Sequence, residues 1–418
     1  MEKPVKSLLR TKGKTVYLLG AGFSRPGGGL IMSNFGTEAF RYLKDKSPDL
    51  AEVFARVINK QRAICEILGL NVYNIEHLFS LVDMPGSKEE DTKGTRNDLI
   101  RIIIVAAEEA FRQRCQVGEE LSEARECVVP YHLIRGTYLE SKPECKHNLA
   151  WGACVYEAFL CKILSDQHKR LSSIQNRDDL DTVITLNWDL LLERKIHRFK
   201  GILFYYGDGI VKTGNYVIAK KHRNKEGKNK EGYDKEGYDK KGFKVIVRKA
   251  PTTPKVLVKT IQMLKIHGSF NWRRDSKVGN EIVERWDNID NFLKSVVEGE
   301  LPPMILPTWR RESREDDIFS RLADLAIQQL RSAEKIVVIG YSMPETDAYF
   351  RYLMARGLET AEFPVVEVWD IQPEEAMKNK LVALFGQAAI DRKRVTYSDK
   401  GLLGFVKSHP FDLGKENQ

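Results

Sequence analysis

The six cysteines of this 418-residue chain include no Cys-x-x-Cys pair. A structural zinc ribbon takes its thiolate ligands from such closely spaced pairs, so the spacing excludes a ribbon and we expect no zinc. The basic residues 1–14 contain no apolar core, which argues against a secretory signal. We therefore expect free thiols buried as small hydrophobic side chains. The cysteines stand at positions 65, 115, 127, 145, 154 and 161.

Long apolar runs are missing as well. No run approaches the ~18 residues that a membrane-spanning helix requires. The hydrophobic content of 42% is ordinary for a globular protein, and the length is enough for two or three lobes. These features predict a cytoplasmic protein that has no contact with a membrane.

Little net positive charge lies outside one segment. The formal net charge is +9, and residues 220–249 hold twelve Lys or Arg against five acidic residues. Within them runs a pentapeptide repeat, for example Asn-Lys-Glu-Gly-Tyr at 229–233 and Asp-Lys-Glu-Gly-Tyr at 234–238. A glycine every fifth residue among charges cannot build a core, so we predict a solvated surface insertion. Because aromatic residues alternate with the basic ones, direct binding to nucleic acid or an acidic partner remains the alternative.

Short apolar runs alternate with helical patterns in the second half of the chain and predict an α/β fold. We expect a doubly wound, parallel, Rossmann-like sheet with a large, mainly helical insertion. The predicted strands are 16–19, 183–186, 244–248, 264–266, 303–306, 335–340, 364–370 and 394–397, with a helix at 190–199. The predicted helices of the insertion are 37–44, 50–68, 75–82, 98–115 and 149–171, with a loop at 85–98.

These patterns divide the chain into predicted parts. Residues 1–35 form the first strand and its glycine loop, and residues 36–178 form the helical insertion. Residues 179–405 complete the Rossmann-like domain and contain the basic insertion at 220–249. Residues 406–418 form a C-terminal tail.

Five residues of chemical interest lie at the carboxyl ends of predicted strands or directly after them. In a doubly wound sheet, ligands bind outside the carboxyl ends of the strands, so these residues are expected to meet there. The residues are Gly20, Asn187, His267, Gly340 and Asp370.

The first of these strand ends carries a glycine loop. Gly20 and Gly22 allow a sharp turn and a close approach of the backbone to a ligand, with N–H groups aimed at a phosphate. The dinucleotide fingerprint places a third glycine three residues later, where this chain has Arg25.

Four segments in this order resemble the signature motifs of the sirtuin superfamily, over roughly residues 14–399. They are Gly-Ala-Gly-Phe-Ser at 20–24, Thr-Leu-Asn-Trp-Asp at 185–189, Lys-Ile-His-Gly-Ser at 265–269 and Gly-Tyr-Ser-Met-Pro-Glu-Thr-Asp at 340–347. The last segment is similar to sirtuin-like NAD hydrolases of bacterial antiviral defence systems. The resemblance implies that Asn187 and His267 are catalytic. It also implies that NAD is bound by Gly20, Ala21, Gly22, Ser24, Arg25, Asp189, Gly340, Ser342 and Asp370.

Each of these residues also has a simpler interpretation. Asn187 and Ser24 are good helix N-caps, and Asp189 is favoured in the first turn of a helix. Arg25 is then a surface charge, Ser342 a turn residue and Asp370 a capping acid. The chain also departs from the family pattern. Leu186 stands where the family often has Gln, and Ser-Asn-Phe-Gly at 33–36 stands in place of Pro-Asp-Phe-Arg.

The resemblance implies an NAD glycohydrolase that cleaves NAD to nicotinamide and ADP-ribose, with His267 as base. It further implies an antiviral effector that acts by NAD depletion (abortive infection). Such an enzyme needs a gate, so we expect a homo-oligomer or a partner, with a hexameric DNA-translocating ATPase as the preferred partner. The alternatives are an NAD-dependent protein deacylase, which the missing zinc ribbon disfavours, and a non-catalytic NAD-binding scaffold subunit.

Overall fold

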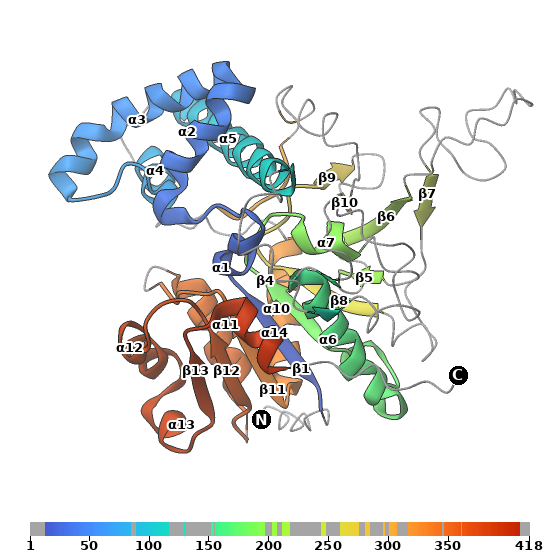
Figure 1. The fold of residues 1–418 in the computed structure, drawn as a ribbon. Helices are drawn as coiled ribbons and strands as arrows, with labels where there is room; N and C mark the ends of the chain where they lie inside the picture. The colour runs from blue at the N-terminus through green and yellow to red at the C-terminus, as the bar shows by residue number, and fades with distance from the viewer. Residues whose placement is uncertain are drawn as a thin grey trace, which may run out of the picture.

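The computed structural model describes the chain in a series of residue ranges, which are given at the end of this paragraph. A seven-stranded sheet lies in its lower half and a group of helices above it (Figure 1). The described residues are 13–84, 89–116, 129–130, 152–153, 155–196, 203–206, 211–217, 244–247, 260–275, 281–284, 296, 301–306, 317–344, 347–360 and 362–409.

The central sheet has the strand order β13-β12-β11-β1-β4-β8-β5, and every neighbouring pair is parallel. The chain builds one side of β1 first and then crosses to β11 on the other side. The topological switch point therefore lies between β1 and β11. This confirms the predicted α/β fold class. The strands are β1 (Thr15–Leu19), β4 (Thr182–Thr185), β5 (Leu203–Tyr205), β8 (Thr260–Lys265), β11 (Lys335–Ile339), β12 (Val365–Trp369) and β13 (Val395–Ser398).

Helices cover this sheet and share one hydrophobic core with it. Tyr17 of β1 meets Phe159 and Phe405 edge to face, with ring centroids 5.4 and 6.3 Å apart. Strands buried on both faces need continuous apolar runs, which explains the pattern of β1. The covering helices are α6 (Val155–Lys169), α10 (Asp317–Ser332), α11 (Ala348–Leu358), α12 (Glu374–Phe385), α13 (Gln387–Asp391) and α14 (Gly401–Ser408).

A second hydrophobic core belongs to the helical lobe, drawn in blue and cyan in Figure 1. Helix α3 starts with Pro48 at its first position and ends at Gly69, whose φ of 66° is typical of a left-handed C-cap. Asn74 caps α4, since its side-chain oxygen accepts a hydrogen bond from the N–H of Glu76. The lobe contains α2 (Phe35–Lys46), α3 (Pro48–Leu68), α4 (Ile75–Val82) and α5 (Glu89–Gln116).

Short elements complete the fold. A four-stranded sheet has the order β7-β6-β10-β9, and a two-stranded one pairs β2 with β3. These strands are β2 (Val129–Pro130), β3 (Gly152–Ala153), β6 (Val211–Val217), β7 (Lys244–Val247), β9 (Trp272–Asp275) and β10 (Glu281–Glu284). The short helices are α1 (Ala21–Ser24), η1 (Arg25–Gly27), η2 (Met32–Asn34), η4 (Leu171–Ser173), η5 (Arg177–Asp179) and α7 (Leu191–Ile196).

The structure corrects several sequence-based boundaries. The predicted loop at 85–98 is wrong from residue 89 onward, where α5 begins, because Glu, Lys and Arg are good helix formers even without an apolar face. The predicted strand at 303–306 is a single bridge between Met304 and Gly268. Helix α6 packs in the sheet's core although it falls within the predicted insertion at 36–178, and α14 extends into the predicted tail at 406–418. The sequence missed the four-stranded sheet apart from β7.

The predicted basic insertion and the cysteines lie only partly within the residues that the structure describes. Residues 218–243, which carry the pentapeptide repeat, lie outside them, whereas residues 244–247 of the same predicted insertion form β7. Cys65 and Cys161 are buried and form no disulfide. Among the helices that the structure describes, none combines the length and the apolar character that crossing a bilayer requires.

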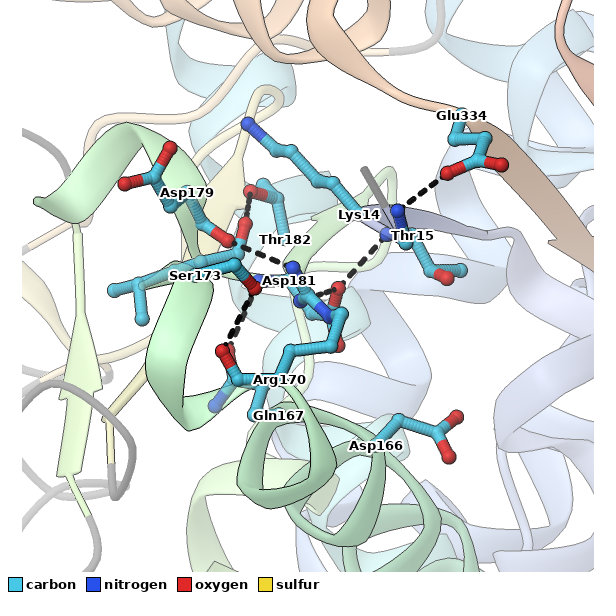
Figure 2. Close-up of polar contacts among 12 residues, drawn as sticks. Lys14, Thr15, Asp166, Gln167, Arg170, Ser173, Asp179, Asp181, Thr182 and Glu334 are labelled. Atoms are coloured by element: carbon cyan, nitrogen blue, oxygen red, sulfur yellow. Dashed lines mark hydrogen bonds and ion pairs between the residues drawn. The ribbon is translucent and has the colours of Figure 1, made fainter. Parts of the chain in front are cut away.

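A buried polar cluster closes the amino-terminal edge of the sheet, at the start of β1 and β4 (Figure 2). Asp181 accepts hydrogen bonds from the backbone N–H of Thr15 at 2.8 Å and from Arg170 at 2.6 Å. Lys14 donates to Gln329 nearby. Burial raises the pKa of Asp181 to about 6 even though Arg170 lies beside it, and burial lowers the pKa of Lys14 to about 8.

This cluster predicts a pH-dependent stability. Between about pH 4 and 6, Asp181 keeps a proton in the folded state that the unfolded chain has released, so its contribution to the free energy of unfolding falls as the pH rises. Asp181→Asn cannot titrate. Relative to the native protein, the variant should gain about 2–3 kcal/mol across this window, as measured by urea unfolding at each pH. The matched control, Asp45→Asn on the exposed surface of α2, should follow the native curve. Parallel curves for Asp181→Asn and native protein would contradict this account.

Candidate functional site

The structure brings the five strand-end residues to one edge of the sheet. Gly20 and Gly340 directly follow β1 and β11, and Asp370 directly follows β12. Asn187 and His267 each lie two residues beyond the end of β4 and β8. These five strands are consecutive neighbours in the order β12-β11-β1-β4-β8, so the residues form a row across the switch point.

The glycines of this row make a close backbone contact. A Cβ on Gly20 would lie 2.5 Å from the Gly340 carbonyl oxygen, and one on Gly340 would lie 2.1 Å from the backbone nitrogen of Phe23. The N–H of Gly20 donates to Ile339 at 3.1 Å, and that of Gly22 donates to Gly340 at 2.8 Å. The N–H groups of Gly20 and Gly22 are therefore both engaged by the β11 segment, and any N–H group of this loop that binds a phosphate belongs to another residue. Contact between the two loops requires the glycines.

Asn187 is held by its amide nitrogen. The Nδ2 group donates to the carbonyl oxygen of Gly20 at 2.9 Å and to Oγ of Ser24 at 3.0 Å. An amide nitrogen carries two hydrogens, and both have acceptors here. The side-chain oxygen Oδ1 is therefore the part of Asn187 that can still serve a ligand.

Ser24 and Asp189 extend this chain of hydrogen bonds. Ser24, 3% exposed, donates its hydroxyl to Oδ2 of Asp189 at 2.7 Å and does not cap the following turn. Oδ1 of Asp189 accepts from the backbone N–H of Leu191 at 3.0 Å, at the start of α7. Asp189 lies two residues before α7, so it is not a first-turn acid, and its Oδ1 instead accepts from the first N–H of the helix. The N-cap interpretation does not apply to Ser24, which connects Asp189 to Asn187.

The loop that carries His267 is fixed against two other segments. The backbone carbonyl oxygen of His267 accepts hydrogen bonds from Nε1 of Trp188 at 3.0 Å and from the N–H of Ile305 at 2.9 Å. Gly268 has a φ of 89°, and a Cβ there would lie 2.3 Å from the carbonyl oxygen of Pro303. The His-Gly pair therefore needs glycine at its second position for a structural reason as well.

The remaining predicted residues lie nearer to solvent or in turns. Ala21 is half-buried in α1, and Arg25 is exposed in η1. Ser342 is exposed, and its carbonyl oxygen accepts from Lys380 at 2.9 Å. Asp370 is buried, and its Oδ1 accepts from the two N–H groups that follow it, at 2.8 and 3.0 Å. Its side chain thus stabilises its own turn.

Sequence reasoning missed the residues that support the site. Leu190, Phe270 and Leu306 belong to the core of the helical lobe, and Trp188 packs against them. The loops after β4 and β8 are therefore anchored in the lobe as well as in the sheet. Lys265 begins the motif at 265–269 but received no predicted role, although a lysine ending a buried strand was a usable signal.

In the described part of the chain, no three His, Cys, Asp or Glu side chains are grouped so as to hold an ion. The site therefore offers hydrogen-bonding groups on fixed loops.

Comparisons with known proteins find only distant structural similarity. No family model matches the chain. No curated protein matches it. A solved structure described as "Structural Basis for the Mechanism and Regulation of Sir2 Enzymes" aligns with 97% of this chain and 92% of its own, at 10% identity and a TM-score of 0.34. A complex of Sir2 with EX-527, 2'-O-acetyl-ADP-ribose and a deacetylated p53 peptide aligns over 94% and 91%, at 10% identity and a TM-score of 0.31. Likeness at this level says nothing about activity.

The glycine contact predicts unequal costs for the same substitution. Gly69 and Gly340 have similar φ values, 66° and 63°, but a Cβ on Gly69 would meet nothing within 4 Å. Gly69→Ala should lose about 1–2 kcal/mol of unfolding free energy from its left-handed backbone alone. Gly340→Ala should lose a further ~1–3 kcal/mol because the β1 and β11 loops must separate. Urea unfolding measures both, and equal losses would contradict the close contact.

Proposed function

We propose that the chain is a sirtuin-like enzyme that hydrolyses NAD to nicotinamide and ADP-ribose. The observation that carries this proposal is the placement of Asn187 and His267 on loops of neighbouring strands, β4 and β8. These loops adjoin the switch point at which doubly wound sheets bind nucleotides. The order of the motifs along the chain resembles that of the sirtuins and supports the same assignment.

The contacts of Asn187 suggest its role. Its amide hydrogens are engaged by Gly20 and Ser24, so Oδ1 is the atom left to accept a hydrogen bond from a ribose hydroxyl or a water. A fixed acceptor orients the attacking water without further loss of entropy during the reaction. Ser24 thereby acts through Asn187, as a positioning residue.

Asp189 is proposed to bind the carboxamide of nicotinamide. Each of its oxygens already accepts one hydrogen bond, from Ser24 and from Leu191. A carboxylate has about four acceptor positions, so an N–H of the carboxamide can be added to the two existing bonds.

His267 is proposed as the base. The glycosidic carbon–nitrogen bond breaks, nicotinamide leaves as a neutral molecule, and the oxygen of water bonds to the anomeric carbon. The proton released by this water passes to the imidazole, whose ordinary pKa suits proton transfer near neutral pH. The adenosine and pyrophosphate are assigned to the side of β1, β11 and β12, with Arg25, Ser342 and Asp370 as the candidate contacts.

Control of this activity is part of the proposal. Depletion of NAD harms the host cell, so an effector of antiviral defence must remain inactive until triggered. Gating by a homo-oligomer or by a hexameric DNA-translocating ATPase is proposed from the resemblance described for residues 340–347.

NAD turnover tests the proposed function. The purified protein, alone or with its partner, should release nicotinamide and ADP-ribose in equal amounts without any peptide, as measured by chromatography. Acetyl-lysine removal with no loss of NAD in the absence of peptide would instead support a deacylase and overturn the proposal.

Two substitutions test the assigned residues. Asn187→Ala and His267→Ala should each lower kcat by at least about 100-fold, because each removes a group that acts on the ribose or the water. The control His168→Ala removes an exposed histidine on α6 and should keep native turnover. Melting temperatures should show that all three variants fold. Native turnover in either site variant would remove that residue from the mechanism.

A further inference from the structure

A buried ion pair lies beneath the candidate site. Lys265 is the last residue of β8, and its Nζ lies 2.7 Å from Oε1 of Glu193 on α7. The two side chains are only 1% and 2% exposed. Taking two charges out of water costs several kcal/mol, and apolar residues of similar size often stabilise a fold equally well. Stability alone therefore does not account for this pair.

The other contacts of Lys265 indicate what the charge does. Its Nζ also lies within hydrogen-bonding distance of the carbonyl oxygens of Trp188, at 3.4 Å, and Asp189. An ammonium group has three N–H donors, and Glu193 and these two carbonyls provide three acceptors. The strand β8 is thereby joined to the loop after β4 and to α7.

This junction lies between the loop that carries Asn187 and the loop that carries His267. His267 is two residues after Lys265, and Asn187 is directly before Trp188. A second hydrogen bond, from the N–H of Phe270 to the carbonyl of Trp188 at 3.0 Å, joins the same two loops. Lys265 is buried, and its ammonium binds loop backbone and Glu193.

We propose that Lys265 is a positioning residue that fixes the distance between Asn187 and His267 by holding the loop after β4 on the end of β8. The inference rests on the proposed function for its catalytic consequence only. The positioning itself concerns two loops of the fold and can be measured without substrate.

The test compares two buried ion pairs at opposite edges of one sheet. Lys265→Met with Glu193→Gln removes the junction and leaves no unpaired charge. The matched control, Arg170→Met with Asp181→Asn, removes the pair in the cluster of Figure 2, far along the strands from the site. Both double variants lose a charged pair of low exposure and a bond to a backbone carbonyl, which Arg170 makes to Asp179 at 3.3 Å.

Steady-state kinetics with NAD give the first readout. The Lys265 double variant should lose about 10- to 100-fold in kcat with little change in KM, because a displacement of about 1 Å of a reacting group is that costly. Glu193→Gln alone should lose less, since Lys265 keeps both carbonyls. The Arg170 double variant should keep native kcat even where its melting temperature falls. Equal losses of kcat in the two double variants would overturn the proposal.

Amide hydrogen exchange gives the second readout. In the Lys265 double variant, the amides of Phe270 and Leu191 should exchange faster, because both bond to groups of the released loop. The amide of Thr15, at the opposite edge, should be unchanged. Native exchange at Phe270 and Leu191 would overturn the proposal. If the native protein does not hydrolyse NAD, the proposed function fails, and the exchange rates alone decide whether Lys265 positions the loops.

Discussion

The contact between the loops after β1 and β11 is the constraint on which the site depends. Gly20, Gly22 and Gly340 meet so closely that a Cβ at any of them would overlap backbone atoms of the facing loop. Asn187 then hydrogen-bonds to the carbonyl of Gly20, so its orientation follows from this contact. A larger residue in either loop would move the backbone that holds Asn187, and through it Ser24 and Asp189.

The amino-terminal and carboxyl-terminal edges of the sheet each contain a buried ion pair, and the two pairs have different surroundings. At the amino-terminal edge, Arg170 pairs with Asp181, and the carboxyl still has a raised pKa because burial outweighs the partner. At the carboxyl-terminal edge, Lys265 pairs with Glu193 and also binds two loop carbonyls. The first pair holds β1 to α6, and the second holds the site loops, so the same kind of interaction serves different parts of the fold.

Several predicted site residues have a structural role beside the functional role proposed for them. Asp189 accepts from the N–H of Leu191 at the start of α7 and also from Ser24, which binds Asn187. Asp370 stabilises its own turn with Oδ1 at the end of β12. Helix starts and turns at strand ends need the same oxygen-bearing side chains that ligands need. Residue type and spacing therefore could not separate the two interpretations.

The sequence by itself determined the parallel sheet and the strand ends that carry Gly20, Asn187, His267, Gly340 and Asp370, because buried runs and the motifs after them are local patterns. It also located the helical tract, although the start of α5 was hidden by charged residues that suit both a loop and a helix. Only the tertiary structure decided what each residue contacts. Gly20 contacts Gly340, Ser24 bonds to Asn187, and Lys265 pairs with Glu193. Each of these contacts joins residues that are more than seventy positions apart in the sequence. Such contacts depend on strand order and loop packing, which leave no periodic signal in the sequence.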